Sequence, residues 1–108
     1  MKEDKTYLLG IVGMIEHYYD KRGLKKPDFD DAMKFVHTEL AEVYELVLAG
    51  KGYIRNHPEN KPTEMDKIKL GRELGDAIMM LIVAGLVEGV DPIESLMSKL
   101  QEKLAQCK

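Results

Sequence analysis

The segment RELGDAIMMLIVAGLV at residues 72–87 decides the fold of this chain. It begins with an acidic pair, Glu73 and Asp76, and continues over residues 77–87 without a polar side chain. That run is well short of the roughly 20 apolar residues that a membrane-spanning helix needs. A helix that is apolar on every side must instead be covered on every side by other helices. The segment therefore predicts the central helix of an all-α bundle.

A second acidic pair, Glu39 and Glu42, lies upstream in another segment with helical periodicity. In each pair the acids are three residues apart, which places them on neighbouring positions of one helical face. Glu39 falls in the middle of the apolar stripe, and a carboxylate directed at a core is costly unless its charge is compensated. Mg²⁺ or Mn²⁺ suits such a cluster, because these ions take carboxylate oxygens and keep positions for water and phosphate. We therefore expect Glu39, Glu42, Glu73 and Asp76 to form one metal site.

The first half of the chain predicts two helices. Apolar residues recur at helical spacing over residues 7–19, and Gly23 suits the end of this helix. Asp28 or Asp30 can cap a second helix, which contains the first acidic pair and ends at Gly50.

The second half predicts two more helices after a loop at residues 51–62, which contains two prolines and lacks periodicity. Thr63 opens the central helix, which ends before Gly89. Asp91 then supplies a cap, and Pro92 a first-turn proline, for a last helix. No stretch alternates like a strand, so residues 1–108 are expected to form a single all-α domain of about four helices.

Composition excludes several classes of protein. The net charge is −3, and the lysines and arginines are scattered, so no basic stripe indicates nucleic-acid binding. The single Cys107 cannot form an internal disulfide and has no partner for a zinc site, which fits a reducing cytoplasm. We expect a cytoplasmic protein without nucleic-acid or membrane partners.

The apolar run at residues 77–87 also predicts an oligomer. Three other helices of one small chain can cover only part of such a helix, so a second subunit is expected to complete the bundle. Gly85 within the run lowers helix propensity by about 1 kcal/mol relative to alanine. Close approach of another helix would offset this cost.

The arrangement TELAE at residues 38–42, followed by ELGD at residues 73–76 in an all-helical chain, resembles the MazG-like nucleotide pyrophosphohydrolases of the all-α NTP pyrophosphatase superfamily. The resemblance extends over roughly residues 29–104. The family motif is an ExxE pair on one helix and an ExxD pair on the next. Many members have a doubled glutamate at the first pair, where this chain has Thr38, and the gap between the pairs is longer here than in compact members.

The resemblance implies an Mg²⁺-dependent enzyme that converts a nucleoside triphosphate to the monophosphate and pyrophosphate, with Glu39, Glu42, Glu73 and Asp76 as catalytic and metal-binding residues. It also implies a homodimer or homotetramer. The last helix of many members carries a Lys-x-Asn-x-Arg pattern that holds phosphate. Lys103 matches the lysine and is the expected substrate-binding residue, whereas Ala105 and Cys107 replace the other two.

Other interpretations of these residues stay open. The acids could be surface residues paired with Lys69 and Arg72, which stand four positions before Glu73 and Asp76. Glu45 could be a fifth ligand, although a solvated glutamate is the favoured interpretation. The adjacent tyrosines at positions 18 and 19 could stack on a nucleobase, although packing is favoured for them. The alternative function is a catalytically silent helical bundle that binds a nucleotide or a partner protein.

Overall fold

The computed structural model describes residues 10–50 and 64–107, and within these residues it contains four helices and no strand. They are α1 (Gly10–Lys21), α2 (Phe29–Gly50), α3 (Glu64–Val87) and α4 (Pro92–Ala105). The all-α prediction is confirmed, whereas the expected helix starts at residue 7 and Thr63 lie outside the described residues. The loop expected at residues 51–62 lies outside the described residues.

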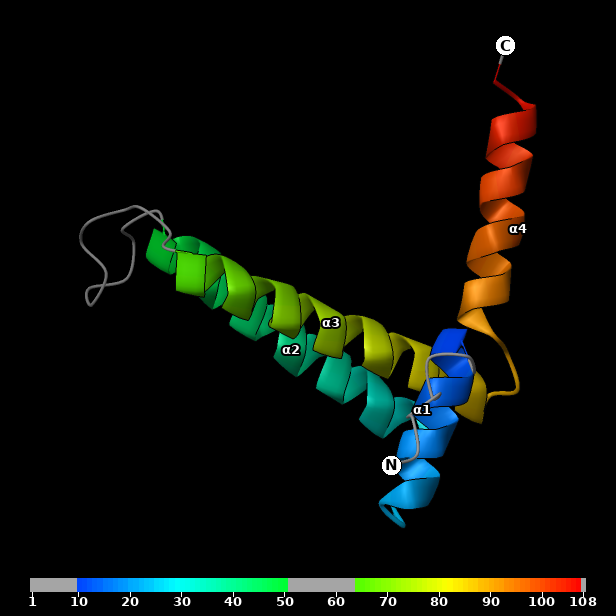
Figure 1. Cartoon of the computed structure of the whole chain (residues 1–108), viewed down its shortest axis with the longest axis horizontal. Helices are drawn as coiled ribbons and strands as arrows, with labels where there is room; N and C mark the ends of the chain where they lie inside the picture. The colour runs from blue at the N-terminus through cyan, green and yellow to red at the C-terminus, as the bar shows by residue number, and fades with distance from the viewer. Residues whose placement is uncertain (1–9, 51–63, 108) are drawn as a thin grey trace, which may run out of the picture.

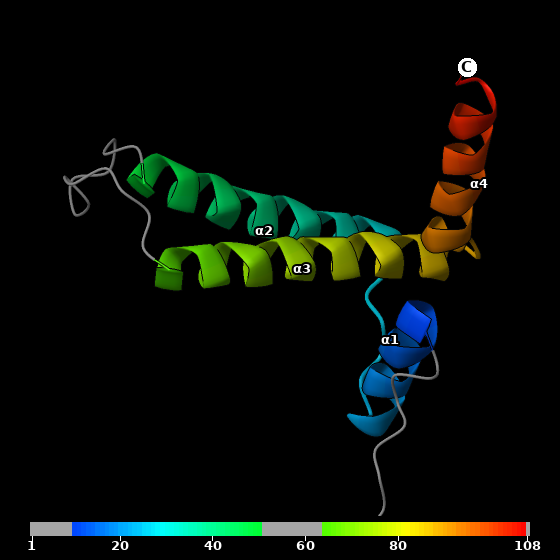
Figure 2. The ribbon, with the colours of Figure 1, turned by 45° about the horizontal axis from the view of Figure 1, so that its top comes forward.

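Helices α2 and α3 pair side by side along their length as an antiparallel hairpin (Figures 1 and 2). Helices α1 and α4 both lie at the end of this hairpin where α2 begins and α3 ends (Figure 1). Helix α4 projects away from the hairpin and has no buried residue. The radius of gyration is 17.5 Å, compared with about 13 Å for a compact domain of this length. A single chain therefore does not close into a four-helix bundle.

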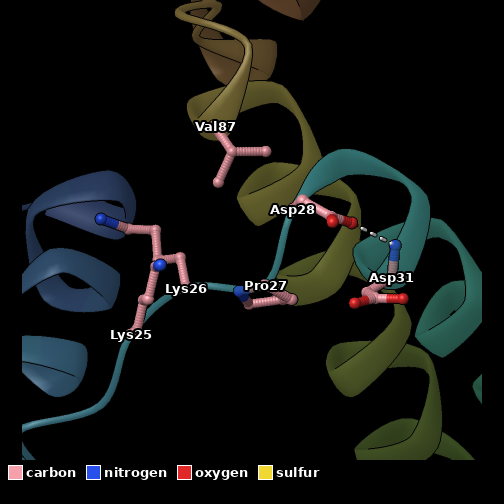
Figure 3. A pocket seen from close by; sticks show the side chains of 6 residues that line it. All are labelled: Lys25, Lys26, Pro27, Asp28, Asp31 and Val87. Carbon is pink, nitrogen blue, oxygen red and sulfur yellow. Dashed lines mark hydrogen bonds between the residues drawn. The ribbon is translucent and has the colours of Figure 1, made fainter.

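The predicted caps begin two of the helices. Asp28 caps α2, because its Oδ1 accepts a hydrogen bond of 2.8 Å from the backbone N–H of Asp31 (Figure 3). Asp91 caps α4, and its Oδ1 accepts from the N–H of Ile93 at 2.9 Å and of Glu94 at 3.3 Å. These bonds satisfy amide groups that have no partner within the helix.

Glycines in the left-handed region end α1 and α3. Gly23 has φ +63° and Gly89 has φ +77°. After α3, the N–H of Val90 donates to the carbonyl of Gly85 at 2.9 Å, and the N–H of Gly89 donates to the carbonyl of Leu86 at 3.0 Å. This pair of bonds is the Schellman motif, in which glycine adopts the positive φ without strain.

The core lies at the α1 end of the hairpin and includes Ile15 and Tyr19 of α1, Ala32 of α2, and Ile82, Val83 and Ala84 of α3. The apolar run of α3 is covered on this face alone. On its other face Ile78 is 54% exposed and Leu81 is 46% exposed. The sequence predicts that α3 is covered on every side. The chain itself buries only part of the apolar surface of this helix.

Gly85 lies where α3 meets the segment that leads into α4. A Cβ atom added there would contact the Cγ of Pro92 and would lie 2.8 Å from its Cδ and 3.2 Å from the carbonyl oxygen of Val90. The close approach expected at Gly85 is therefore present, and this chain's own α3–α4 connection provides it.

Replacing Gly85 with alanine is expected to lower the free energy of unfolding by about 1–3 kcal/mol, because the added methyl group overlaps the Pro92 ring. Gly71→Ala on the same helix is the matched control, since nothing lies within 4 Å of the added Cβ there. It should be neutral or stabilising by up to about 1 kcal/mol. Urea denaturation measures both, and equal stabilities of the two variants would contradict this packing.

Candidate metal centre

The pairing of α2 with α3 brings three of the predicted acids together. Glu39, Glu42 and Glu73 each offer a carboxylate oxygen, and these oxygens all lie within 4.8 Å of one another. Glu39 and Glu73 are half-buried in the seam between the helices, whereas Glu42 is exposed at its edge. Glu73 of α3 is more than 30 positions from the two glutamates of α2 in the sequence, and the three residues are referred to below as the carboxylate triad.

Glu39 is in the least favourable environment of the three. Its Oε2 is buried and has no hydrogen-bond partner. Burial, followed by hydrogen bonding with Glu73 and by the charges of Glu42 and Asp76, raises the pKa of Glu39 from 4.5 to about 7. A buried acceptor without a partner costs free energy that a bound cation or donor would recover.

The other two carboxylates shift in opposite directions. Hydrogen bonding with Glu73, and then the charge of Glu73, raises the pKa of Glu42. Hydrogen bonding with Glu42 and then with Glu39 lowers the pKa of Glu73. The triad thus shares protons between its members when no cation is bound, as expected for like charges held close together.

The surface ion pairs considered as an alternative are not formed. Lys69 and Arg72 lower the pKa of Glu73 through their charges. Neither forms a direct ion pair with Glu73 or Asp76 in the part of the chain that the structure describes. The two basic residues therefore act on Glu73 through their charges and without a direct ion pair.

Three other residues considered from the sequence lie outside the triad. Asp76 is exposed, and its oxygens do not belong to the carboxylate triad. Its charge nevertheless contributes to the raised pKa of Glu39. Glu45 is exposed further along α2. Lys103 is in the last turn of α4, which projects away from the hairpin (Figure 1). Within one chain, Lys103 is not brought to the triad.

Next to Asp76 the structure contains an apolar pocket that sequence reasoning missed. Its volume is about 400 Å³, and it is lined by Met14, Ile15 and Tyr18 of α1 and by Asp76 and Met79 of α3. We refer to it as the α1–α3 pocket. The only sign of this pocket in the sequence was the possible stacking role of Tyr18. The other residues that line the pocket could be identified only from the position of α1 across α3.

A second cavity, of about 480 Å³, lies beside the start of α2 and is lined by Lys25, Lys26, Pro27, Asp28, Asp31 and Val87 (Figure 3). Several of its charged groups already have structural partners. Lys26 forms an ion pair of 2.6 Å with Glu16, and Asp28 caps α2. Two lysines and two aspartates line it, so neither sign of charge dominates. The triad is the better candidate for ligand binding.

The triad fits a small hard cation. Opposite ligands of an octahedral Mg²⁺ are about 4.2 Å apart, since each Mg–O bond is about 2.1 Å. The oxygens of Glu39, Glu42 and Glu73 lie within 4.8 Å of one another, a limit of the same order as this spacing. No histidine or cysteine belongs to the cluster, so an oxygen-preferring ion is favoured.

No known protein-family model matches the chain, and neither a curated protein nor a solved structure is significantly similar to it. Among the described residues, no helix combines the length and apolar character required to cross a membrane.

Without divalent cations, the contribution of Glu39 to stability should fall as the pH rises from about 4.5 to 7. The folded state binds a proton at Glu39 more tightly than the unfolded state does, so the stability from that proton is present at low pH and lost through pH 7. Glu39→Gln should flatten this dependence in thermal melts recorded from pH 5 to pH 8. Glu45→Gln, an exposed site on the same helix, should retain it. Identical profiles for both variants would contradict the assignment to Glu39.

Proposed function

We propose that this protein is a metal-dependent nucleotide pyrophosphohydrolase that converts a nucleoside triphosphate to the monophosphate and pyrophosphate. The observation that carries the proposal is the convergence of Glu39, Glu42 and Glu73, with a buried oxygen of Glu39 left without a partner. The resemblance of the two acidic pairs to the MazG-like motif supports the reaction type.

Glu39, Glu42 and Glu73 would hold Mg²⁺ or Mn²⁺, with Asp76 one helical turn beyond Glu73 at the edge of the site. The bound cation supplies charge neutralisation for the triphosphate oxygens and acidifies water. Four acids without compensating cations repel a polyphosphate, so binding of the substrate depends on the metal.

In the reaction, a water oxygen forms a bond to phosphorus, and the bridging P–O bond between the α and β phosphates breaks. Pyrophosphate leaves, and the water's proton passes to a carboxylate. Glu42 is suited to accept it, because it is the exposed member of the triad and an oxygen that it leaves out of the coordination can face water. Within the described residues no serine, cysteine or histidine lies in the triad to act as a covalent nucleophile.

The alternative is a catalytically silent helical bundle that binds a nucleotide or a partner protein. The position of Lys103 favours it, because the phosphate-binding lysine expected from the resemblance does not reach the triad within one chain. Hydrolysis of a nucleoside triphosphate would distinguish the enzyme from the silent bundle.

With Mg²⁺, ³¹P NMR of a panel of nucleoside triphosphates should show pyrophosphate and monophosphate, and no nucleoside diphosphate. Glu39→Gln and Glu73→Gln should each lower the rate about 100-fold or more, as expected when one electrostatic stabiliser of the transition state is lost. Glu45→Gln controls for a change of charge on α2 and should remain active. Calorimetry should show weaker Mg²⁺ binding in the first two variants only. If no triphosphate is hydrolysed with Mg²⁺ or Mn²⁺, the silent-bundle alternative becomes the better account.

We further propose that the working form is a homodimer or homotetramer. The face of α3 that carries Ile78 and Leu81 is open in one chain, as are Leu96, Leu100 and Leu104 of α4. Large exposed apolar patches are rare on monomers and are typical of subunit interfaces. A second copy would cover these surfaces and could bring its own α4 toward the triad.

Light scattering at micromolar concentration should therefore give the mass of a dimer or tetramer. Ile78→Lys and Leu81→Lys should dissociate it, because these side chains are exposed within one chain and their substitution does not disturb the monomer core. Val83→Lys is unsuitable as a test, since Val83 is 0% exposed and its replacement would unfold the chain itself. Gln101→Lys on α4 is the control. A monomeric wild-type protein would refute the proposal.

A further inference from the structure

The α1–α3 pocket adjoins the carboxylate triad through Asp76 of α3, which lines the pocket and whose charge acts on Glu39. Glu73, Asp76 and Met79 follow one another at intervals of three residues. Glu73 belongs to the triad, Met79 lines the pocket, and Asp76 lies between them and lines the pocket as well. The distance along the helix from Glu73 to Met79 is about 9 Å, at about 1.5 Å per residue. A ligand anchored at the triad can therefore extend into the pocket.

The walls of the pocket suit a flat, uncharged and polarisable group. Met14, Ile15 and Met79 supply apolar surface, and methionine sulfur makes favourable contacts with aromatic rings. Tyr18 supplies an aromatic ring that is 43% exposed, and Met14 beside it is 42% exposed. The volume of about 400 Å³ falls within the range of small-molecule sites, about 300–1,000 Å³.

The ring of Tyr18 is held in place from within the protein. It forms an edge-to-face contact with the buried ring of Tyr19, with centroids 5.6 Å apart and an interplanar angle of 86°. The guanidinium of Arg22 also lies 5.8 Å from its centroid. A preorganised aromatic ring loses little conformational entropy when a ligand stacks on it.

The charge of the triad and of the α1–α3 pocket determines which part of a nucleotide each of them can bind. The polyphosphate is anionic and requires the cation held by the triad, whereas the apolar pocket with Asp76 at its edge repels it. The nucleobase is flat and uncharged. We propose that the α1–α3 pocket binds the nucleobase of the triphosphate, with Tyr18 as the stacking surface, an inference that rests on the proposed function.

Methyl NMR of methionine tests the pocket without catalysis or metal. Addition of guanosine, adenosine, cytidine or uridine to the full chain should shift the methyl signals of Met14 and Met79 through the ring current of the bound base. Met97, on α4 and outside the pocket, should not shift. The Tyr18→Ala variant should lose the response, and Tyr18→Phe should retain it.

Kinetics provide the second measurement, with inorganic tripolyphosphate as the probe that lacks a base. Tyr18→Ala should raise KM for the preferred nucleoside triphosphate about tenfold, as expected for loss of one base–aromatic stack, and should leave KM for tripolyphosphate and kcat unchanged. Tyr44→Ala, at an exposed tyrosine of α2 outside the pocket, is the matched control.

The outcomes separate this inference from the proposed function. Methionine shifts without any hydrolysis would support the pocket and overturn the enzymatic proposal. Hydrolysis with unshifted methionines and an unchanged KM in Tyr18→Ala would overturn the pocket and leave the enzyme standing. Unresponsive methionines together with a changed mass of Tyr18→Ala in light scattering would also overturn it, because the pocket would then be covered by a second copy of the chain.

Discussion

The mutual repulsion of three carboxylates in the seam between α2 and α3 is the constraint on which the structure depends. The two helices pair along their length, yet Glu39 and Glu73 are half-buried in the seam between them, with Glu42 exposed at its edge. The buried Oε2 of Glu39 has no partner there. Apolar residues of the same size would often stabilise such a hairpin more, and this cost of the acids is what the proposed cation would offset.

The apolar core cluster of the described residues lies at the α1 end of the hairpin. Ile15 and Tyr19 of α1 pack there against Ala32 and the Ile82–Ala84 region of α3. The caps at Asp28 and Asp91 and the glycine turns set the directions in which α1 and α4 leave the hairpin. The core thereby holds α1 across α3, beside Asp76, and this placement creates the α1–α3 pocket next to the triad.

The helix boundaries and caps followed from local chemistry, and so did the all-α class. Asp91 and Pro92 start α4, and Gly89 ends α3, because capping depends on side chains within a few residues of the helix end. The pairing of Glu39 with Glu73 was also predictable, since periodicity placed each on the apolar face of its helix. The choice between Asp28 and Asp30 as the cap of α2 required the structure, because both residue types suit that position.

The sequence by itself determined the four helices, the acidic faces of two of them and the apolar excess of α3, because all three depend on the spacing of residues along one helix. Only the tertiary structure decided which acids meet. It grouped Glu39, Glu42 and Glu73, left Asp76 beside them, and directed α4 with Lys103 away from the hairpin. It also joined Tyr18 to Met79 in one pocket. These relations depend on the angles at which helices cross, which arise from the packing of side chains distant in sequence and are not encoded in any single helical period.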